Sequence, residues 1–248
     1  MTDNNYFKFS NSVLLVPIIA VLSIWTVYWV ELQFKINFNH FGVYPRTLSG
    51  IKGVFFSPFI HGSLKHLYSN TLPLVVLSAA LVYFYKPVAF KVLFYGTLLS
   101  GLITWVIGRP SYHIGASGVI YLLASFIFFK GVFAKHFRLI ALSLFVVFVY
   151  GSMLWYILPI KEGISWEGHL GGFITGLFFA YFLKADIPIP KKYAWEEDSY
   201  NEEADEFLRH FDEDGNFIES TPESEPETDL DTTTPIKITY HYKENKEE

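Results

Sequence analysis

Two residues in apolar surroundings carry side chains that can act as a nucleophile and its base. Ser117 lies between glycines in HIGASGVIY (residues 113–121), and His169 lies in GHLGGFITG (residues 168–176). A serine hydroxyl is a weak nucleophile unless an adjacent base takes its proton. A histidine can be that base and can later return the proton to a leaving amine. The pair therefore indicates acyl-transfer chemistry, provided that the chain brings the two segments together.

Glycines beside both side chains would allow this contact. Gly118 follows the serine, and Gly172 and Gly176 follow the histidine at helical spacing. Such glycines let a second backbone approach a helix closely. Gly115 serves either a close approach or a turn. Taken alone, the serine would be a structural residue whose hydroxyl bonds a carbonyl of its own helix, and the histidine would be an interfacial residue.

A second polar pair lies upstream. His66 and Asn70 in HLYSN are four residues apart, so on a helix they share one face and can point at one spot. An ionisable residue in a membrane span is costly and usually faces a polar cavity. We therefore expect the pair to face such a cavity.

The elements that must position these residues are membrane helices. Of the 248 residues 51% are hydrophobic and only 17% are charged, which is unusual for a soluble chain. Each long apolar stretch is near the roughly 17 to 25 residues that cross a bilayer. The stretches cover about residues 13–30, 67–85, 88–107, 117–133, 137–158 and 167–183. This pattern predicts six spans, the first of them an uncleaved anchor.

Charge divides the chain into a basic body and an acidic tail. Residues 193–248 hold 4 basic and 19 acidic residues, with STPESEPETDLDTTTP at their centre. Such a segment buries too little apolar surface to order itself. Basic residues between the spans favour a cell-membrane protein with both termini in the cytoplasm. We expect a cytoplasmic amino terminus at 1–12, a six-helix membrane domain at 13–185, and a cytoplasmic, largely disordered tail at 186–248.

Three motifs together carry a family resemblance. HGSLKHLYSN, GASG and GHLGGFITG fall in this order on the second, fourth and sixth predicted spans. The set resembles the rhomboid intramembrane serine proteases over about residues 10–185. The resemblance implies an all-α membrane protein, a six-transmembrane-helix bundle whose active site lies below the outer membrane surface. It also implies water access and cleavage of transmembrane substrates.

The resemblance also implies roles for single residues. Ser117 and His169 would form a catalytic dyad without an acidic third member, and Glu167 would not face His169 on a helix. Tyr121, one turn after Ser117, would pack beneath the histidine ring. The oxyanion would be stabilised by the Ser117 backbone N–H and by the side chains of His66 and Asn70.

No cofactor or metal is expected. The chain has no cysteine, and HGSLKH lacks the spacing and the glutamate of a zinc protease helix. The implied partners are transmembrane protein substrates and the lipid bilayer. We expect no nucleic acid partner, and any partner of the tail is unknown.

Two positions depart from the family pattern. Many rhomboids have a Trp-Arg pair in the first outer loop, where this chain has Lys52 and Gly53. Either the nearby Arg46 substitutes for the pair or the loop is built differently. Gly168 stands where an alanine is common.

Two other functions remain open at this stage. A proton-coupled transporter would use buried histidines but would not need Ser117 between glycines. A non-proteolytic rhomboid-like binding or quality-control protein is the main alternative. Such proteins usually lack part of the dyad, whereas this chain has both members.

The acidic tail yields a first prediction. A chain shortened to end at Lys192 keeps the last span and its flanking lysines. Its cleavage rate on a reporter in detergent should therefore stay within about threefold of the rate of the full chain. This corresponds to a change of roughly 0.65 kcal/mol in the activation barrier. A tenfold loss in a folded, shortened protein would instead show that the tail completes or regulates the enzyme.

Overall fold

The chain is all-helical over the residues that the structure describes. The computed structural model describes residues 9–134, 137–149 and 155–184, and in the tail residues 193, 195, 197–202, 205, 207–212 and 214–218. These ranges contain helices and isolated β-bridges but no β-strand. The α-helices are α1 (Ser12–Phe34), α2 (Gly53–Phe56), α3 (Leu64–Phe84), α4 (Lys86–Ile107), α5 (Ser117–Phe133), α6 (Phe137–Val149) and α7 (Trp166–Phe182). The 3₁₀ helices are η1 (Asn39–Phe41), η2 (Ser57–Phe59), η3 (Trp155–Ile157) and η6 (Leu208–His210).

The chain divides into two units, Met1–Pro190 and Lys191–Glu248. In the first unit each of the six apolar stretches contains a helix, namely α1, α3, α4, α5, α6 and α7. Among the described helices, α1, α3 and α4 are long and apolar enough to cross a membrane by themselves. Helix α5, of 17 residues, is apolar but shorter. The all-α class is confirmed, and the count of six spans stays a prediction.

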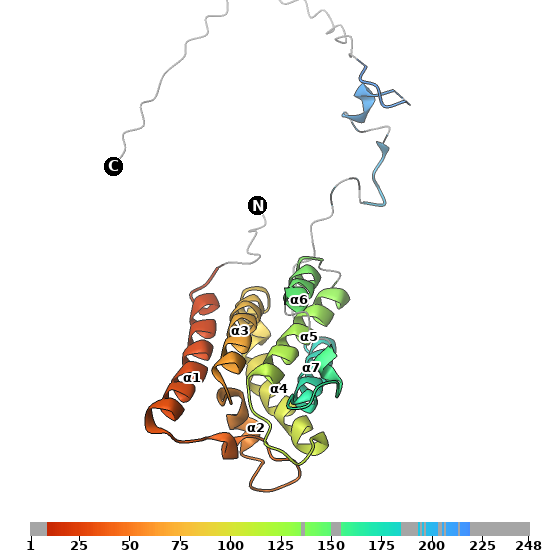
Figure 1. Ribbon diagram of the computed structural model, residues 1–248. Coiled ribbons are helices and arrows are strands. Elements are labelled where there is room, and N and C mark those ends of the chain that lie inside the picture. The colour runs from red at the N-terminus through yellow and green to blue at the C-terminus, as the bar shows by residue number, and fades with distance from the viewer. Residues whose placement is uncertain are drawn as a thin grey trace, which may run out of the picture. The chain divides into compact units, whose positions relative to one another are not determined.

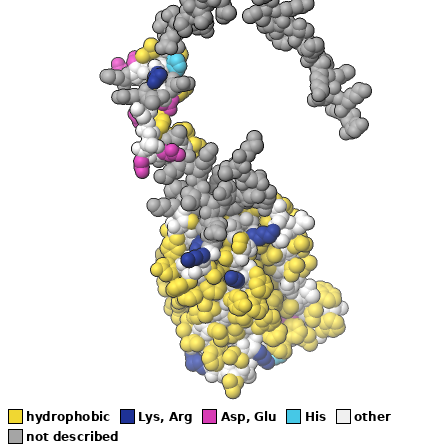
Figure 2. All heavy atoms as spheres, turned by 180° about the vertical axis from the view of Figure 1, so that it is seen from behind, with side chains coloured by type: hydrophobic (Ala, Val, Ile, Leu, Met, Phe, Trp, Pro, Cys, Tyr) yellow, Lys and Arg dark blue, Asp and Glu magenta, His cyan; other side chains and the backbone are white. Residues whose placement is uncertain are grey.

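The outer surface of the helical unit is apolar. Only 17% of the most apolar window of α1 is buried, and side chains such as Leu14, Ile18 and Leu22 are more than half exposed. Hydrophobic side chains cover most of the face of this unit seen in Figure 2. A large contiguous apolar surface marks an interaction or membrane site. Together with the spans, it indicates a protein embedded in lipid.

Hydroxyl groups inside the bundle are mostly bonded to their own helices. Four side chains donate to the carbonyl four residues earlier: Thr71 to Leu67, Ser78 to Leu74, Thr104 to Ser100 and Thr175 to Gly171. This is the usual way to satisfy a hydroxyl where water is scarce. A hydroxyl that bonds elsewhere therefore needs an explanation.

Helix α5 is the centre of the first unit. It contacts α3, α4, α6 and α7, and it runs among these helices in Figure 1. Most of its residues from Val119 to Ile127 are buried. At its far end Lys130 donates to the carbonyls of Ala180 and Leu183, the last carbonyls of α7. Helices α5 and α7 are thus joined along their length.

The loop between α1 and α3 contains the short helices η1, α2 and η2. Arg46 donates to the carbonyls of Val106 and Gly108 at the end of α4, and Trp105 Nε1 donates to the carbonyl of Thr47. A Cβ at Gly53 would collide with the backbone of Gly42. No larger residue fits at Gly53, and Arg46 anchors the loop to the end of α4.

The described part of the second unit is small. It contains η6 and an isolated bridge between Phe211 and Phe217, with Asp212 accepting from the backbone N–H groups of Asp214 and Asn216. The expected disorder of the tail concerns mainly residues outside the described ranges, including 219–248. That expectation stays a prediction.

Candidate active site

Ser117 and His169 are in direct contact. Ser117 is the first residue of α5, and its Oγ lies 2.9 Å from Nε2 of His169 in the first turns of α7. The two residues are 52 positions apart in the chain. His169 is buried, with 7% of its surface exposed. A hydroxyl and an imidazole thus lie within hydrogen-bond distance at a buried position.

The hydrogen-bond partner of the second ring nitrogen shows which nitrogen of His169 carries the hydrogen. Nδ1 lies 2.9 Å from the carbonyl oxygen of Tyr156 in η3. A carbonyl can only accept, so Nδ1 carries the hydrogen and Nε2 has the free lone pair. The Ser117 hydroxyl therefore donates to Nε2, which is the arrangement needed to take the serine proton.

Tyr121 lies against the same imidazole. Its ring stacks on the His169 ring, with centroids 4.2 Å apart and planes 15° from parallel. Tyr121 is one helical turn after Ser117, so α5 supplies both the hydroxyl and the ring that contact His169. The structure places Tyr121 where the family resemblance implied.

Glycines make the contact between α5 and α7 possible. A Cβ at Gly172 would collide with the carbonyl oxygen of Gly118, and one at Gly176 with that of Leu122. A Cβ at Gly118 would lie 3.3 Å from the carbonyl oxygen of Gly168. The two backbones are therefore in contact, and side chains at these positions would separate the serine from the histidine.

Gly115 lies beside the pair His66 and Asn70. Its φ is +110°, a conformation that favours glycine, and a Cβ there would lie 2.6 Å from Cε1 of His66 and 3.6 Å from Nδ2 of Asn70. Gly115 thus serves both a turn and a close approach. His66 and Asn70 therefore lie next to the segment that leads into Ser117.

His61 is a site residue that sequence reasoning missed. Its Nε2 lies 3.0 Å from Nδ2 of Asn70 and accepts a bond from the N–H of Ala116 at 3.4 Å. On a helix, a residue five positions before His66 would point elsewhere. Ser63 caps α3, however, so His61 precedes the helix and folds back into the site. Asn70 Nδ2 has two hydrogens, so one remains for a ligand.

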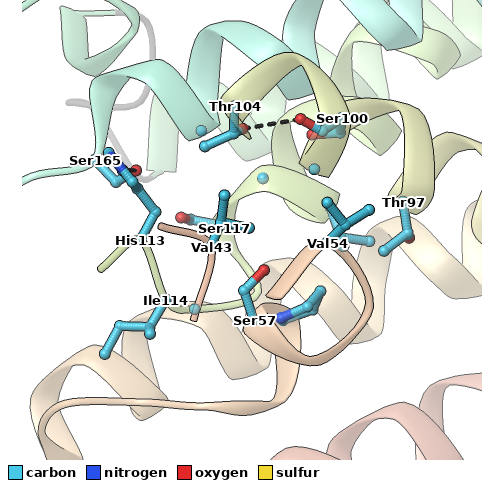
Figure 3. Close-up of a pocket in the computed structure, with 16 residues that line it drawn as sticks. Val43, Val54, Ser57, Thr97, Ser100, Thr104, His113, Ile114, Ser117 and Ser165 are labelled. Carbon is cyan, nitrogen blue, oxygen red and sulfur yellow. Dashed lines mark hydrogen bonds between the residues drawn. The ribbon is translucent and has the colours of Figure 1, made fainter. Parts of the chain in front are cut away.

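A small polar cavity lies beside Ser117. Its volume is about 40 Å³, which is enough for water. Figure 3 shows hydroxyl-bearing side chains around it, from Ser57, Thr97, Ser100, Thr104 and Ser165, together with His113. Water can therefore be held next to the serine although the surrounding bundle is apolar.

An apolar helical unit with a serine–histidine pair in contact is a membrane protein with a candidate functional site. Residues 49–186, more than half of the chain, match the rhomboid family, described as Rhomboid domain. The chain belongs to the rhomboid family, as its three motifs predicted.

Relatives among curated proteins carry no stated function. Uncharacterized proteins of Mycobacterium bovis and Mycobacterium tuberculosis are each 37% identical over 158 residues, which cover 58% of this chain and 64% of the relative. An uncharacterized protein of Mycobacterium leprae is 35% identical over 147 residues, covering 54% of this chain and 56% of the relative. The matches thus span less than two thirds of these relatives.

The environment of His61 yields a pH prediction. Burial, and then the neighbouring His66, lower the pKa of His61 to about 4. Between pH 6.5 and about 4 the unfolded chain takes up a proton at residue 61 that the folded chain does not, so folding stability falls as the pH falls through this window. The loss should be on the order of 3 kcal/mol.

His61→Gln is the matched variant, because its amide oxygen can accept from the same donors without titrating. Unfolding in detergent, followed from pH 7 to pH 4, should show a smaller loss of stability for His61→Gln than for the wild type. Equal losses would contradict the prediction.

Proposed function

We propose that the chain is an intramembrane serine endopeptidase that cleaves transmembrane segments of membrane proteins through a serine–histidine dyad. The observation that carries the proposal is the 2.9 Å contact between Ser117 Oγ and His169 Nε2, with Nδ1 held by the Tyr156 carbonyl. Several buried hydroxyls of the bundle donate to backbone carbonyls, of their own helix for Thr104 and Thr175 or of α7 for Ser125, whereas this one bonds to an imidazole. That difference favours a nucleophile over a packing residue.

In the proposed reaction Ser117 Oγ attacks the scissile carbonyl while His169 Nε2 takes its proton. The imidazolium then gives this proton to the leaving amine, and an acyl-enzyme ester remains on Ser117. A water molecule, deprotonated by the same nitrogen, attacks the ester and releases Ser117. The polar cavity beside Ser117 supports such a water supply.

The developing oxyanion would be bound by three donors, namely the backbone N–H of Ser117 and the side chains of His66 and Asn70. Their proximity to Gly115, which leads into Ser117, supports this role. Asn70 is 5% exposed and its amide is held by His61, so it needs little reorganisation during the reaction.

The dyad lacks an acidic third member, and two contacts take its place. The Tyr156 carbonyl fixes the imidazole tautomer, and the Tyr121 ring restricts the imidazole plane. A carboxylate on a serine protease histidine orients the ring and stabilises its charged form. Here we assign the orientation to Tyr156 and Tyr121.

The proposed topology is a six-helix bundle at 13–185 with both termini in the cytoplasm and a disordered tail at 186–248. Substrates would be transmembrane helices with a locally unstable segment, because an intact helix keeps its carbonyls in internal hydrogen bonds. The polar and catalytic residues lie toward the end of the bundle where α5 and α7 begin, which fits access from one membrane surface.

The central prediction concerns the dyad. Ser117→Ala and His169→Ala should each abolish cleavage of a reporter transmembrane segment, and the double variant should be little worse than either, because the two residues act as a unit. Ser125→Ala is the matched control, because Ser125 is a buried serine of α5 that donates to the Phe173 carbonyl. Its cleavage rate should stay within about threefold of the wild-type rate, a small change in the activation barrier.

Labelling with a fluorophosphonate probe gives a second readout of the same variants. Wild type and Ser125→Ala should be labelled, and Ser117→Ala should not. Cleavage that survives Ser117→Ala would refute the protease assignment. A folded wild type that neither cleaves nor labels would instead support a non-proteolytic rhomboid-like binding or quality-control protein.

Asn70→Ala separates the oxyanion donor from the dyad. Turnover of the reporter should fall by roughly one to three orders of magnitude, the range for one lost donor. Reaction with a small phosphonate should persist, because Ser117 and His169 stay in contact. Unchanged turnover would reassign Asn70 to holding His61, and thermal unfolding in detergent would then show its structural contribution.

A further inference from the structure

Glu167 is a buried carboxylate close to the dyad but not part of it. It lies in the first turn of α7, two residues before His169, and only 1% of its surface is exposed. A buried carboxylate is costly unless it is paired and hydrogen-bonded. Its partners lie on the 108–116 segment, which joins α4 to α5.

Arg109 makes the closest contacts with Glu167. Its backbone N–H donates to Oε1 of Glu167 at 3.1 Å, and its Nε lies 3.7 Å from the same oxygen. Its Nη2 donates to the carbonyl of Ile164, just before α7. One residue of the 108–116 segment is thus attached to α7 and to the chain leading into it.

His113 extends the same connection. Its Nε2 lies 3.1 Å from the Arg109 carbonyl, which can only accept, so Nε2 carries the hydrogen. Its Nδ1 then accepts from the Ser165 hydroxyl at 2.6 Å, which attaches His113 to the residue just before α7. Figure 3 shows His113 beside Ser165 at the edge of the cavity.

Local backbone features favour this arrangement. His113 pairs with Val43 through two backbone hydrogen bonds of 2.8 and 3.0 Å, which fixes the middle of the 108–116 segment. A Cβ at Gly168 would lie 2.9 Å from Oγ of Ser165. Glycine at position 168 therefore leaves room for the hydroxyl that bonds His113.

The two ends of this network lie next to the two catalytic residues. The 108–116 segment leads directly into Ser117, and Glu167 precedes His169 by two residues. Glu167 does not act on the imidazole directly, because Nδ1 of His169 is bonded to the Tyr156 carbonyl and Nε2 to Ser117.

We propose that Glu167 is a positioning residue: through Arg109 it holds the 108–116 segment on α7, beside the contact of His113 with Ser165, and so sets the distance between Ser117 Oγ and His169 Nε2. The catalytic consequence rests on the proposed protease function, whereas the structural attachment does not. A misplacement of about 1 Å in an active site can cost about a hundredfold in rate.

The test compares Glu167→Ala with Glu167→Gln, which keeps an oxygen that can accept from Arg109. The matched control is Glu162→Ala, which removes an exposed carboxylate from the loop before α7. Hydrogen–deuterium exchange of the full chain in detergent is measured for the 108–116 segment and, as a reference, for α3. Reporter kcat and KM and the rate of fluorophosphonate labelling are measured on the same samples.

We expect Glu167→Ala to speed exchange of the 108–116 segment at least tenfold with α3 unchanged, and to lower kcat about tenfold to a hundredfold with KM unchanged. Glu167→Gln and Glu162→Ala should stay within about threefold of wild type in kcat, a small change in barrier.

If residues 108–116 of the Glu167→Ala variant exchange at the wild-type rate, the proposal is overturned, whether or not the variant is active. Equal acceleration in α3 would also overturn it, because it would show general destabilisation. If Glu167→Gln speeds exchange and lowers kcat as much as Glu167→Ala does, the role of Oε1 as the acceptor is overturned. A wild type that neither cleaves nor labels would refute the protease function, while the exchange comparison would still decide the attachment.

Discussion

The site depends on backbone contact between α5 and α7. Gly172 lies against the carbonyl of Gly118, and Gly176 against that of Leu122, so neither position tolerates a side chain without moving a helix. Because Ser117 and His169 belong to these two helices, their 2.9 Å contact follows from the same approach. The stacking of Tyr121 on His169 requires it as well. In lipid, where apolar side chains gain little from meeting each other, small residues are a principal means of joining helices.

The parts of the structure that could be predicted from the sequence are those encoded by residue type at regular spacing. Apolar runs of membrane-spanning length marked the helices from α1 to α7, except the four-residue α2. Glycines at spacings of three and four marked the face of α7 that contacts α5. The family resemblance implied the place of Tyr121, and the spacing of one helical turn from Ser117 agrees with it. In each case the information lies within one helix and needs no knowledge of the loops.

The parts that could not be predicted depend on backbone atoms or on where a helix begins. The acceptor for His169 Nδ1 is the carbonyl of Tyr156, a group that every residue has, so no residue type signals it. His61 precedes the Ser63 cap of α3, so helical spacing from His66 does not predict its contact with Asn70. Helical spacing correctly predicted that Glu167 does not face His169. Its partner Arg109 is 58 residues away in the chain, and local spacing cannot reveal such a contact.

The position of Ser117 at the first residue of α5 has an electrostatic consequence. The opening turn of a helix has N–H groups without intrahelical acceptors, and the aligned peptide dipoles give that end about half a positive charge. Helix α5 has 17 residues and its interior is buried, so this field acts through a medium of low dielectric constant. Negative charge that develops next to Ser117 is therefore stabilised by the helix itself. Mobile ions screen exposed charges far more than buried ones, so this stabilisation is expected to change little with ionic strength.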